Sequence, residues 1–292
     1  MDSSTQVVVS LTTTPPRFKL VGETLKSLLD QDFPAHQIEL YIPKTYRRFQ
    51  EHSFCVPEVP DGITVKVVEN DLGPATKVLP CVQNYRGHNT RIIYCDDDRS
   101  YPSYWLKRLI HTTKIRPEDC IVVWGFTVDR FGFERKFSRL RPRAKLFISR
   151  RGGIKNLPSN IPFWLSRIAC QIQNRTLQKP PKLFTGGYVD IAEGLGGVSV
   201  SPDFFSQEVF EIPPLLWTHD DVWLSGQLEV NGIGIWVDKY FWNQGRYKII
   251  EIENPGANES EPLYKAVFNG LDRENLNKFC INYFRENYGI WL

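Results

Sequence analysis

The chain has 292 residues, of which 41% are hydrophobic and 24% are charged, a balance that excludes disordered, fibrous and coiled-coil proteins. The net charge of +3, from 36 basic and 33 acidic residues, is too balanced to indicate a nucleic-acid-binding protein. The mean hydropathy is −0.32 and no apolar run approaches about 18 residues, so we expect no membrane-spanning helix.

The N-terminal sequence MDSSTQVVVSLTTTPP has no basic region and only a short apolar run, so it does not predict a secretory signal. The six cysteines form no CxxC pair, which argues against a zinc ribbon or a dithiol redox site. This usage suits a reducing compartment, and we expect a cytoplasmic protein.

The first 125 residues alternate strand and helix signals. Strands are expected at residues 6–11, 38–43, 63–69, 91–95 and 120–124, and helices at 21–32, 75–85 and 104–113. Pro80 is expected to kink or interrupt the second helix. This alternation predicts βαβ units, and therefore an α/β fold with a mainly parallel sheet flanked by helices. Ligands of such sheets bind at the carboxyl ends of the strands.

The second half is less regular. Residues 125–165 are rich in arginine, glycine and proline, and arginines gather between 130 and 145 and again at Arg150 and Arg151. This cluster fits either a solvated basic face or a patch for an anionic acceptor or a membrane surface. Further on, the pattern predicts a glycine-rich loop and strand at 193–200, a helix at 218–230, a strand at 233–238 and an aromatic tail at 245–292.

Three consecutive acids follow the fourth predicted strand, in the segment YCDDDRSYP of residues 94–102. Asp96, Asp97 and Asp98 repel one another, and a cluster at the end of a buried strand needs a counter-charge. A hard divalent cation held by carboxylate oxygens and substrate phosphates would supply it. The alternative is a solvated acidic turn before the next helix.

This segment resembles the DxD motif of GT-A glycosyltransferases, which use nucleotide-diphosphate sugars and a metal. Three further landmarks follow the order of that family: VVVSLTTTPPRF (7–18), DLGPATK (71–77) and WTHDDVWLSG (217–226). The resemblance covers roughly residues 6–240 and is closest to family-2-like enzymes. It implies a Rossmann-like GT-A domain over 1–245, with a donor half at about 1–125, an acceptor half at about 126–245, and a C-terminal extension at 246–292 packed on it.

The resemblance implies that Asp98 coordinates Mn²⁺ or Mg²⁺, and that Asp96 contacts the donor's ribose or helps to hold the metal. Asp97 joins the donor-binding residues with a less defined role. No histidine follows His219 to act as the further metal ligand found in many such enzymes, so Asp238 or water would have to complete the site.

The opening loop and the third-strand loop offer donor-binding groups. Hydroxyls and amides can bind a base and ribose, and a guanidinium can pair with phosphate; the candidates in the opening loop are Thr12, Thr13, Thr14 and Arg17. A hydroxyl-rich turn that stabilises itself is the alternative. Asp71 can accept from a nucleobase N–H and Lys77 can bind a diphosphate, unless Lys77 is an ordinary surface lysine.

Two later motifs would complete the site. Glu193 can hold hydroxyls of the donor sugar, while Gly196 and Gly197 let the backbone approach a sugar closely; a simple turn before a strand is the alternative. Asp221, with Asp220 as co-candidate, resembles the catalytic base of inverting enzymes. Thr218 and Asp221 also fit a capping box at a helix start.

These observations predict a metal-dependent glycosyltransferase that moves a sugar from a UDP- or GDP-sugar to a hydroxyl of a glycan, a lipid-linked or another acceptor, with inversion favoured. The alternatives are a retaining enzyme of the same fold, a sugar nucleotidyltransferase and a non-catalytic sugar-binding protein. The nucleotidyltransferase would need an early glycine-rich phosphate loop, which TTTPPRF does not provide.

Overall fold

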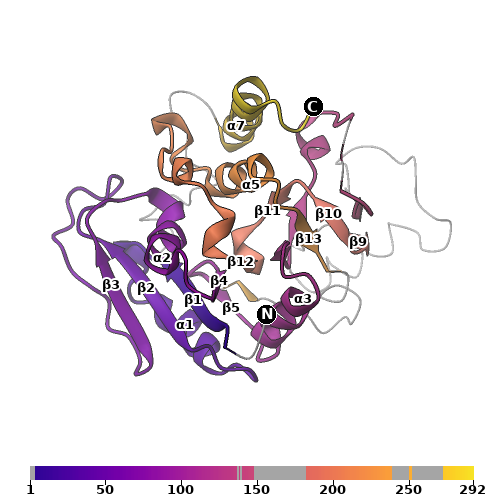
Figure 1. The fold of residues 1–292 in the computed structure, drawn as a ribbon. Coiled ribbons are helices and arrows are strands. Elements are labelled where there is room, and N and C mark those ends of the chain that lie inside the picture. Colours follow the sequence, from indigo (N-terminus) through magenta and orange to yellow (C-terminus); the bar gives the residue numbers. More distant parts are fainter. Residues whose placement is uncertain (1–3, 137, 139, 148–181, 239–249, 252–271) are drawn as a thin grey trace, which may run out of the picture.

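A computed structural model describes residues 4–136, 138, 140–147, 182–238, 250–251 and 272–292. Its centre is an eight-stranded sheet in the order β10-β13-β6-β12-β4-β1-β2-β3 (Figure 1). The strands of this sheet are β1 (Gln6–Thr12), β2 (Gln37–Pro43), β3 (Ile63–Val68), β4 (Thr90–Tyr94), β6 (Cys120–Val122), β10 (Gly187–Val189), β12 (Val198–Val200) and β13 (Ile235–Val237). The predicted α/β class with a mainly parallel, helix-flanked sheet is confirmed.

The first four strands run parallel, with β1 between β2 and β4. β12 is inserted antiparallel between β4 and β6, while β13 continues parallel to β6 and β10 closes the edge antiparallel to β13. The five strands predicted in the first half therefore all form. The carboxyl ends of β1, β4 and β6 meet at one edge of the sheet.

Both faces of the central strands β1 and β4 are buried, because these strands are largely apolar runs whose successive side chains point to opposite faces of the sheet. Val7 and Val9 of β1 pack into one hydrophobic cluster, whereas Val8 between them packs into the other, as the two-residue period of a strand requires. The first cluster includes α1 (Val21–Leu29) and α3 (Trp105–Ile115). The second includes α2 (Leu79–Tyr85), α5 (Asp220–Val230) and α7 (Arg273–Tyr288).

The helix predicted at 75–85 is divided. A 3₁₀ turn, η2 (Gly73–Lys77), ends at Val78, and α2 then begins at Leu79 with Pro80 in its first turn. Proline is tolerated there because the first N–H groups of a helix have no intrahelical partner. The interruption therefore precedes Pro80, and Pro80 lies in the first turn of α2 without kinking it.

Short strand pairs decorate the sheet. β7 (Gly125–Phe126) pairs with β11 (Ile191–Ala192), β5 (Arg99–Ser100) with β14 (Ile250–Glu251), and β8 (Lys145–Phe147) with β9 (Lys182–Thr185). Much of the predicted 125–165 excursion, with Arg150 and Arg151, and of the 245–292 tail lies outside the described residues. The limits of the domain and its halves stay a prediction.

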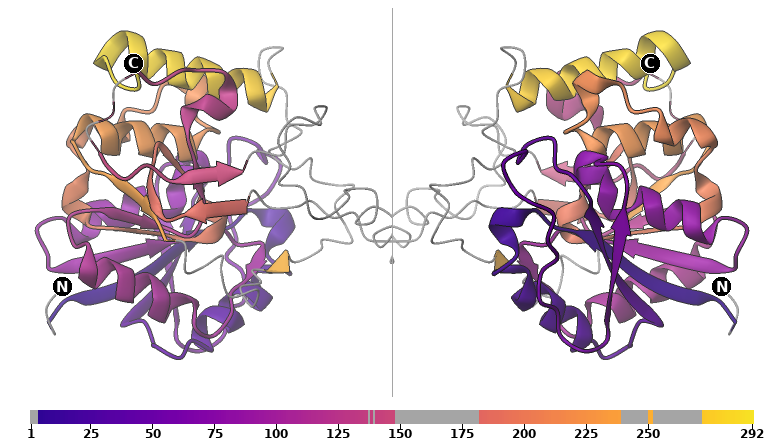
Figure 2. Two further views of the ribbon diagram at one scale, coloured as in Figure 1. Left: turned by 90° about the vertical axis from the view of Figure 1, so that its right-hand side faces the viewer. Right: turned by 90° about the vertical axis from the view of Figure 1, so that its left-hand side faces the viewer.

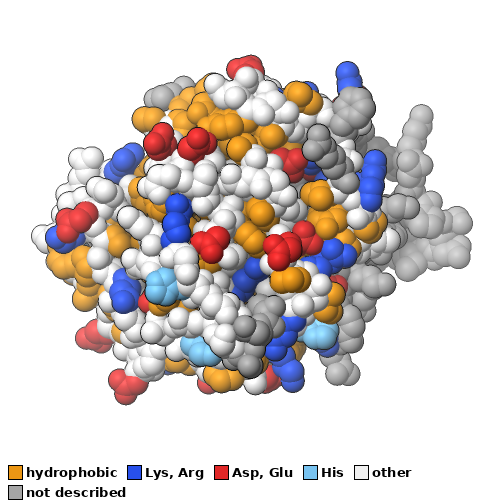
Figure 3. Space-filling view, in the orientation of Figure 1, with side chains coloured by type: hydrophobic (Ala, Val, Ile, Leu, Met, Phe, Trp, Pro, Cys, Tyr) orange, Lys and Arg blue, Asp and Glu red, His pale blue; other side chains and the backbone are white. Residues whose placement is uncertain are grey.

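Helix α7 lies at one end of the molecule, with α5 between it and the sheet (Figures 1 and 2). The two helices approach closely because Gly226 of α5 has no side chain: a Cβ there would lie 2.3 Å from the ring of Phe284. Charged side chains of both signs are interspersed over the face shown in Figure 3, as the balanced composition predicts. Among the described residues, no helix combines the length and apolar character needed to cross a bilayer.

Candidate active site

The candidate site lies where β1 and β4 end. The two strands are in parallel register, with Ser10 opposite Tyr94, so the loops that follow them leave the sheet side by side. The loop after β1 carries Thr13 and Arg17, and the loop after β4 carries the three acids. The fold thus brings together two motifs that the sequence places far apart.

Asp97 joins these two loops. Its carboxylate accepts hydrogen bonds from Thr13 Oγ1 and, at 2.8 Å, from Arg17 Nε, while its backbone carbonyl accepts from Thr24 Oγ1 at 2.8 Å. Both side-chain hydrogen bonds end on Oδ2, so one oxygen of Asp97 links the loop after β1 to the loop after β4. Asp97 and Thr13 therefore shape the loop, and Arg17 already has an acidic partner.

Asp98 forms weaker interactions with its neighbours than Asp97 does. Its side chain is 29% exposed, Arg99 Nε lies 3.2 Å from Oδ1, and Arg17 Nη1 lies 3.9 Å from Oδ2. Oδ1 accepts no hydrogen bond of good geometry from the residues that the structure describes. Burial, and then the neighbouring Asp96 charge, raise the pKa of Asp98 to about 6. An oxygen with this environment gains from a nearby cation.

Lys77 occupies the centre of the site and is only 5% exposed. Its Nζ lies 2.7 Å from Asp96 Oδ1 and 2.7 Å from Asp220 Oδ2. Burial opposes its charge, but Asp220 and then Asp96 raise the pKa of Lys77 well above its ordinary value. The surface-lysine interpretation is therefore wrong. Lys77 connects the 71–77, 94–102 and 217–226 motifs through a buried ion pair with Asp220 and a partly buried one with Asp96.

The two adjacent acids of α5 differ in their surroundings. Asp220 is 4% exposed and paired with Lys77, whereas Asp221 is partly exposed and its Oδ1 accepts from the Gly194 N–H at 2.9 Å. Burial, and then the Asp220 charge, raise the pKa of Asp221 to about 7. Of the two, Asp221 has the proton affinity and access that a general base requires.

The capping-box interpretation of Thr218 and Asp221 is wrong. The residue preceding α5 is His219, and no side chain caps this helix. Thr218 Oγ1 instead lies 2.9 Å from His219 Nδ1, and the Asp221 carboxylate turns to Gly194. Burial lowers the pKa of His219 to about 4, so this ring is neutral and lines the buried side of the site.

The glycine-rich loop contacts the site through a glycine that the sequence analysis did not single out. A Cβ at Gly194 would lie 2.7 Å from Lys77 Nζ and 3.3 Å from Asp96 Oδ1. Gly196 and Gly197 instead pack on tryptophans: Trp105 Nε1 donates to the Gly196 carbonyl at 2.8 Å, and a Cβ at Gly197 would lie 2.4 Å from Trp105. Their small size serves packing within the chain.

Glu193 precedes this loop and faces Arg130, with Oε1 3.5 Å from Nη1. Burial raises the pKa of Glu193 even though Arg130 opposes the shift. Two other arginines of the 130–145 segment, Arg135 and Arg143, pair with the fully buried Asp190. Arg135 and Arg143 therefore serve internal ion pairs, whereas Arg130 is exposed and pairs with Glu193 nearer the surface.

The remaining candidates are placed by contacts with other parts of the fold. Asp71 accepts at 2.8 Å from the N–H groups of both Arg47 and Gly73, and Thr12 Oγ1 donates to the Tyr41 carbonyl at 2.7 Å. Burial raises the pKa of Asp71. Thr14 precedes the 3₁₀ turn η1 (Pro15–Arg17) and does not cap it. Asp238 accepts from Thr112 Oγ1 at 2.7 Å, so it binds helix α3.

Ser225 is a further residue that sequence reasoning missed. Its hydroxyl donates to the Asp221 carbonyl at 2.6 Å and accepts from the Ala192 N–H at 2.9 Å. Ser225 therefore ties the first turn of α5 to β11, directly before the glycine-rich loop. The sequence signal is only a serine one helical turn after Asp221, which is too common to identify.

Replacing Ser225 with alanine should lower the free energy of unfolding by about 1–3 kcal/mol, because the buried Ala192 N–H loses its acceptor. Urea denaturation measures this value. The exposed Ser103→Ala variant is the control and should change stability by less than about 0.5 kcal/mol. Equal stability of Ser225→Ala and the parent would contradict the link.

Comparisons with known proteins give distant structural likenesses. A scan against protein-family models and a search of curated proteins found no match. Among solved structures, the chain is similar to S. aureus TarS, with 18% identity over 42% of this chain and 22% of that one, and a TM-score of 0.29. It is also similar to TarS 1-349, with 17% identity over 47% and 41% of the two chains and a TM-score of 0.30.

The same TarS fragment in complex with UDP is 18% identical over 48% of this chain and 40% of that one, with a TM-score of 0.29. The chain therefore spans less than half the length of each of these structures. The function proposed below rests on the geometry of the site.

Proposed function

We propose that this protein is a metal-dependent glycosyltransferase that transfers a sugar from a UDP- or GDP-sugar to a hydroxyl of a glycan, a lipid-linked or another acceptor. One observation carries the proposal: Lys77 joins Asp96 and Asp220, so the two acidic motifs form one site at the carboxyl end of β4. Such an edge is where α/β sheets bind their ligands. A non-catalytic sugar-binding protein would not need several buried acids around one lysine.

The residues present fit a divalent cation. Asp98 has an oxygen without a good hydrogen-bond donor among the described residues and a pKa raised by burial, and Asp96 lies beside it. The described residues contain no group of three or more metal-ligating side chains, so phosphates of the donor would supply further ligands. When bound, the cation would neutralise charge on the diphosphate leaving group. Mn²⁺ and Mg²⁺ both suit these oxygen ligands.

Asp221 is the proposed general base. It would take the proton of the acceptor hydroxyl. The Gly194 N–H, which donates to Asp221 Oδ1 at 2.9 Å, would hold the carboxylate in position. Asp220 would keep Lys77 charged and oriented beside Asp96. A single base on the acceptor side fits direct displacement, so we propose that the anomeric configuration is inverted.

Metal-dependent hydrolysis of a panel of UDP- and GDP-sugars tests the proposal, because it needs no knowledge of the acceptor. We expect hydrolysis of at least one donor with Mn²⁺ or Mg²⁺ and its loss with EDTA. Absence of both hydrolysis and nucleotide binding across the panel would overturn the proposal.

Asp98→Ala should abolish the metal-dependent part of nucleoside-diphosphate binding and leave the fold intact, because its carboxylate has little structural bonding. Titration calorimetry with and without Mn²⁺, next to a thermal unfolding curve, measures both effects. Asp129→Ala, outside the site, is the matched control. Unchanged stimulation of binding by metal in Asp98→Ala would contradict the role of this residue.

A further inference from the structure

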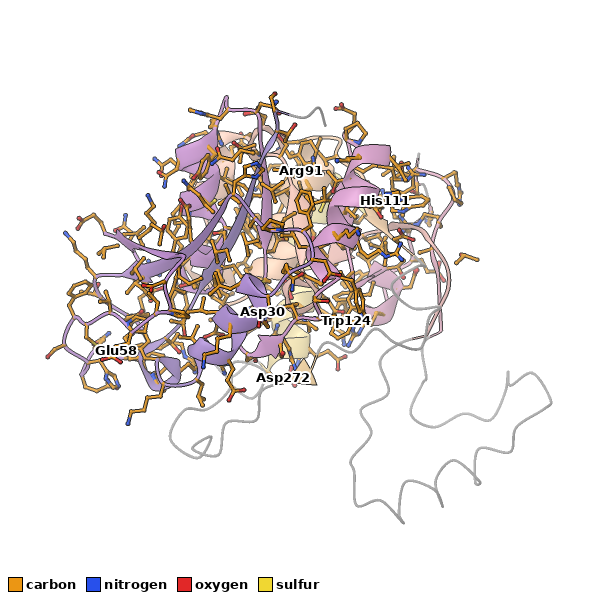
Figure 4. The ribbon with its side chains drawn as sticks, turned by 90° about the horizontal axis from the view of Figure 1, so that it is seen from below. Asp30, Glu58, Arg91, His111, Trp124 and Asp272 are labelled. Carbon is orange, nitrogen blue, oxygen red and sulfur yellow. The ribbon has the colours of Figure 1, made fainter. Side chains whose placement is uncertain are left out.

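Arg273 is the first residue of the C-terminal helix α7, which begins after the N-cap Asp272. Asp272 lies on the same side of the molecule as Trp124, which follows β6, and opposite Arg91, which lies near the start of β4 (Figure 4). The start of α7 is therefore at the carboxyl edge of the sheet. The packing of α7 on α5 through Gly226 and Phe284 holds it there.

The surroundings of Arg273 connect it to the candidate site. Its backbone lies beside the ring of His219, the residue directly before Asp220 and Asp221. Its positive charge is a small contribution that opposes the burial-driven rise in the pKa of Glu193 and Asp221 and adds to the lowering of the pKa of Asp96 by Lys77. Asp96 follows β4, Glu193 precedes the glycine-rich loop and Asp221 lies in the first turn of α5 next to His219, so the start of α7 lies near the point at which these segments converge.

Neither helix stability nor a fixed ion pair explains why an arginine occupies position 273. A cation in the first turn of a helix faces the positive end of the helix dipole, where acids are preferred. Among the residues that the structure describes, no carboxylate lies within ion-pair distance of the Arg273 guanidinium, whereas Lys77 and Arg17 both have such partners. Arg273 is thus a partly exposed cation at the site whose hydrogen-bond donors remain available.

We propose that Arg273 binds the diphosphate of the donor, opposite the acidic loop. The planar guanidinium offers paired N–H donors that match phosphate oxygens. Lys77 is held by two carboxylates, so a second cation is needed to contact the phosphates directly. The inference rests on the proposed function and assigns the C-terminal helix a part in it.

The test compares UDP with uridine, and GDP with guanosine, by titration calorimetry at a fixed Mn²⁺ concentration. Arg273→Gln should weaken binding of the diphosphate by about 10- to 100-fold and leave binding of the nucleoside unchanged, because a charge-assisted contact is lost. Arg273→Lys should recover part of the affinity. Lys278→Gln is the matched control, since Lys278 lies on the same helix and pairs with Glu274 at 2.8 Å.

The outcomes separate the two proposals. If the parent protein binds neither diphosphate, the proposed function fails and the inference fails with it. If the parent binds a diphosphate and Arg273→Gln binds it equally well, only the inference fails. An equal loss for nucleoside and diphosphate would indicate a merely structural role and also overturn it. If Arg273→Gln does not fold, Arg273→Met takes its place, and an unchanged preference for the diphosphate over the nucleoside in that variant overturns the inference.

Discussion

Replacing Asp221 with asparagine is expected to lower turnover by about 10²–10⁴-fold, the usual contribution of a general base. The amide keeps the shape of the side chain, and its oxygen can still accept from the Gly194 N–H. Binding of the donor nucleotide should persist, because Asp96 and Asp98 lie on another loop. Steady-state kinetics and calorimetry on the same preparation measure the two effects.

The pH profile adds an independent readout. The base acts as a carboxylate, and burial with the Asp220 charge raises the pKa of Asp221 to about 7. The active form therefore increases as pH rises, and the parent rate should climb through about pH 7 and then level off. Asp221→Asn should lose this acidic limb, since no proton is left to remove.

Asp220→Asn serves as the comparison. Asp220 is buried against Lys77, so its amide should affect stability and the orientation of Lys77 but should retain the acidic limb of the pH profile. Near-parental turnover in Asp221→Asn would show that Asp221 is not the general base. Product stereochemistry, read by NMR with the parent enzyme, is a separate check, because retention of configuration would exclude the direct displacement assigned to Asp221.

Replacing Lys77 with methionine is expected to lower the free energy of unfolding by about 3–5 kcal/mol near neutral pH, because Asp96 and Asp220 then stay at their positions without a counter-charge. The charge of Lys77 lowers the pKa of Asp96 against the effect of burial. The stabilisation is present above the ordinary pKa of an aspartate and is lost as pH falls below it. The difference between parent and variant should therefore narrow below about pH 4.

Two further variants test whether the loss of stability in Lys77→Met comes from the unpaired acids. Lys44→Met breaks an exposed pair with Glu69 and should cost no more than about 1 kcal/mol. Lys77→Met combined with Asp220→Asn removes one of the unpaired charges and should recover part of the stability. Denaturation curves across pH measure all of these values, and a Lys77→Met variant as stable as the parent would contradict the buried ion pairs.

The sequence predicted the sheet well because its first five strands are short runs rich in β-branched residues. Four of them are largely buried on both faces, and only the edge strand β3 is partly exposed. The acids after β4 and Lys77 were also recognisable, since they directly follow strand ends or their neighbouring turns. The role of Asp97 was not predictable, because its partners Thr13 and Arg17 come from the loop after β1 and only strand register brings them near.

The remaining features depend on tertiary contacts with no local pattern. Thr218 has the spacing of a capping residue, but the neighbouring His219 ring and the Gly194 N–H provide other hydrogen-bond partners. Gly194 differs from Gly196 and Gly197 only in what lies beside it. Arg273 is far along the chain from the acidic motifs, and only the packing of α7 on α5 brings it to the site.

The position of β12 between β4 and β6 bears on how the chain acquires its structure. Strands β1 to β4 can pair once residue 94 has been synthesised, but β6 finds its neighbours only in β12 and β13, which come much later. The entropy cost of closing such long loops comes before the strand contacts that offset it, and this slows folding. We therefore expect a nascent chain that ends before Val198 to leave one edge of β4 bare, and such an edge invites pairing with other chains. Strand β12, which emerges well after β4, would thus protect the first strands from aggregation.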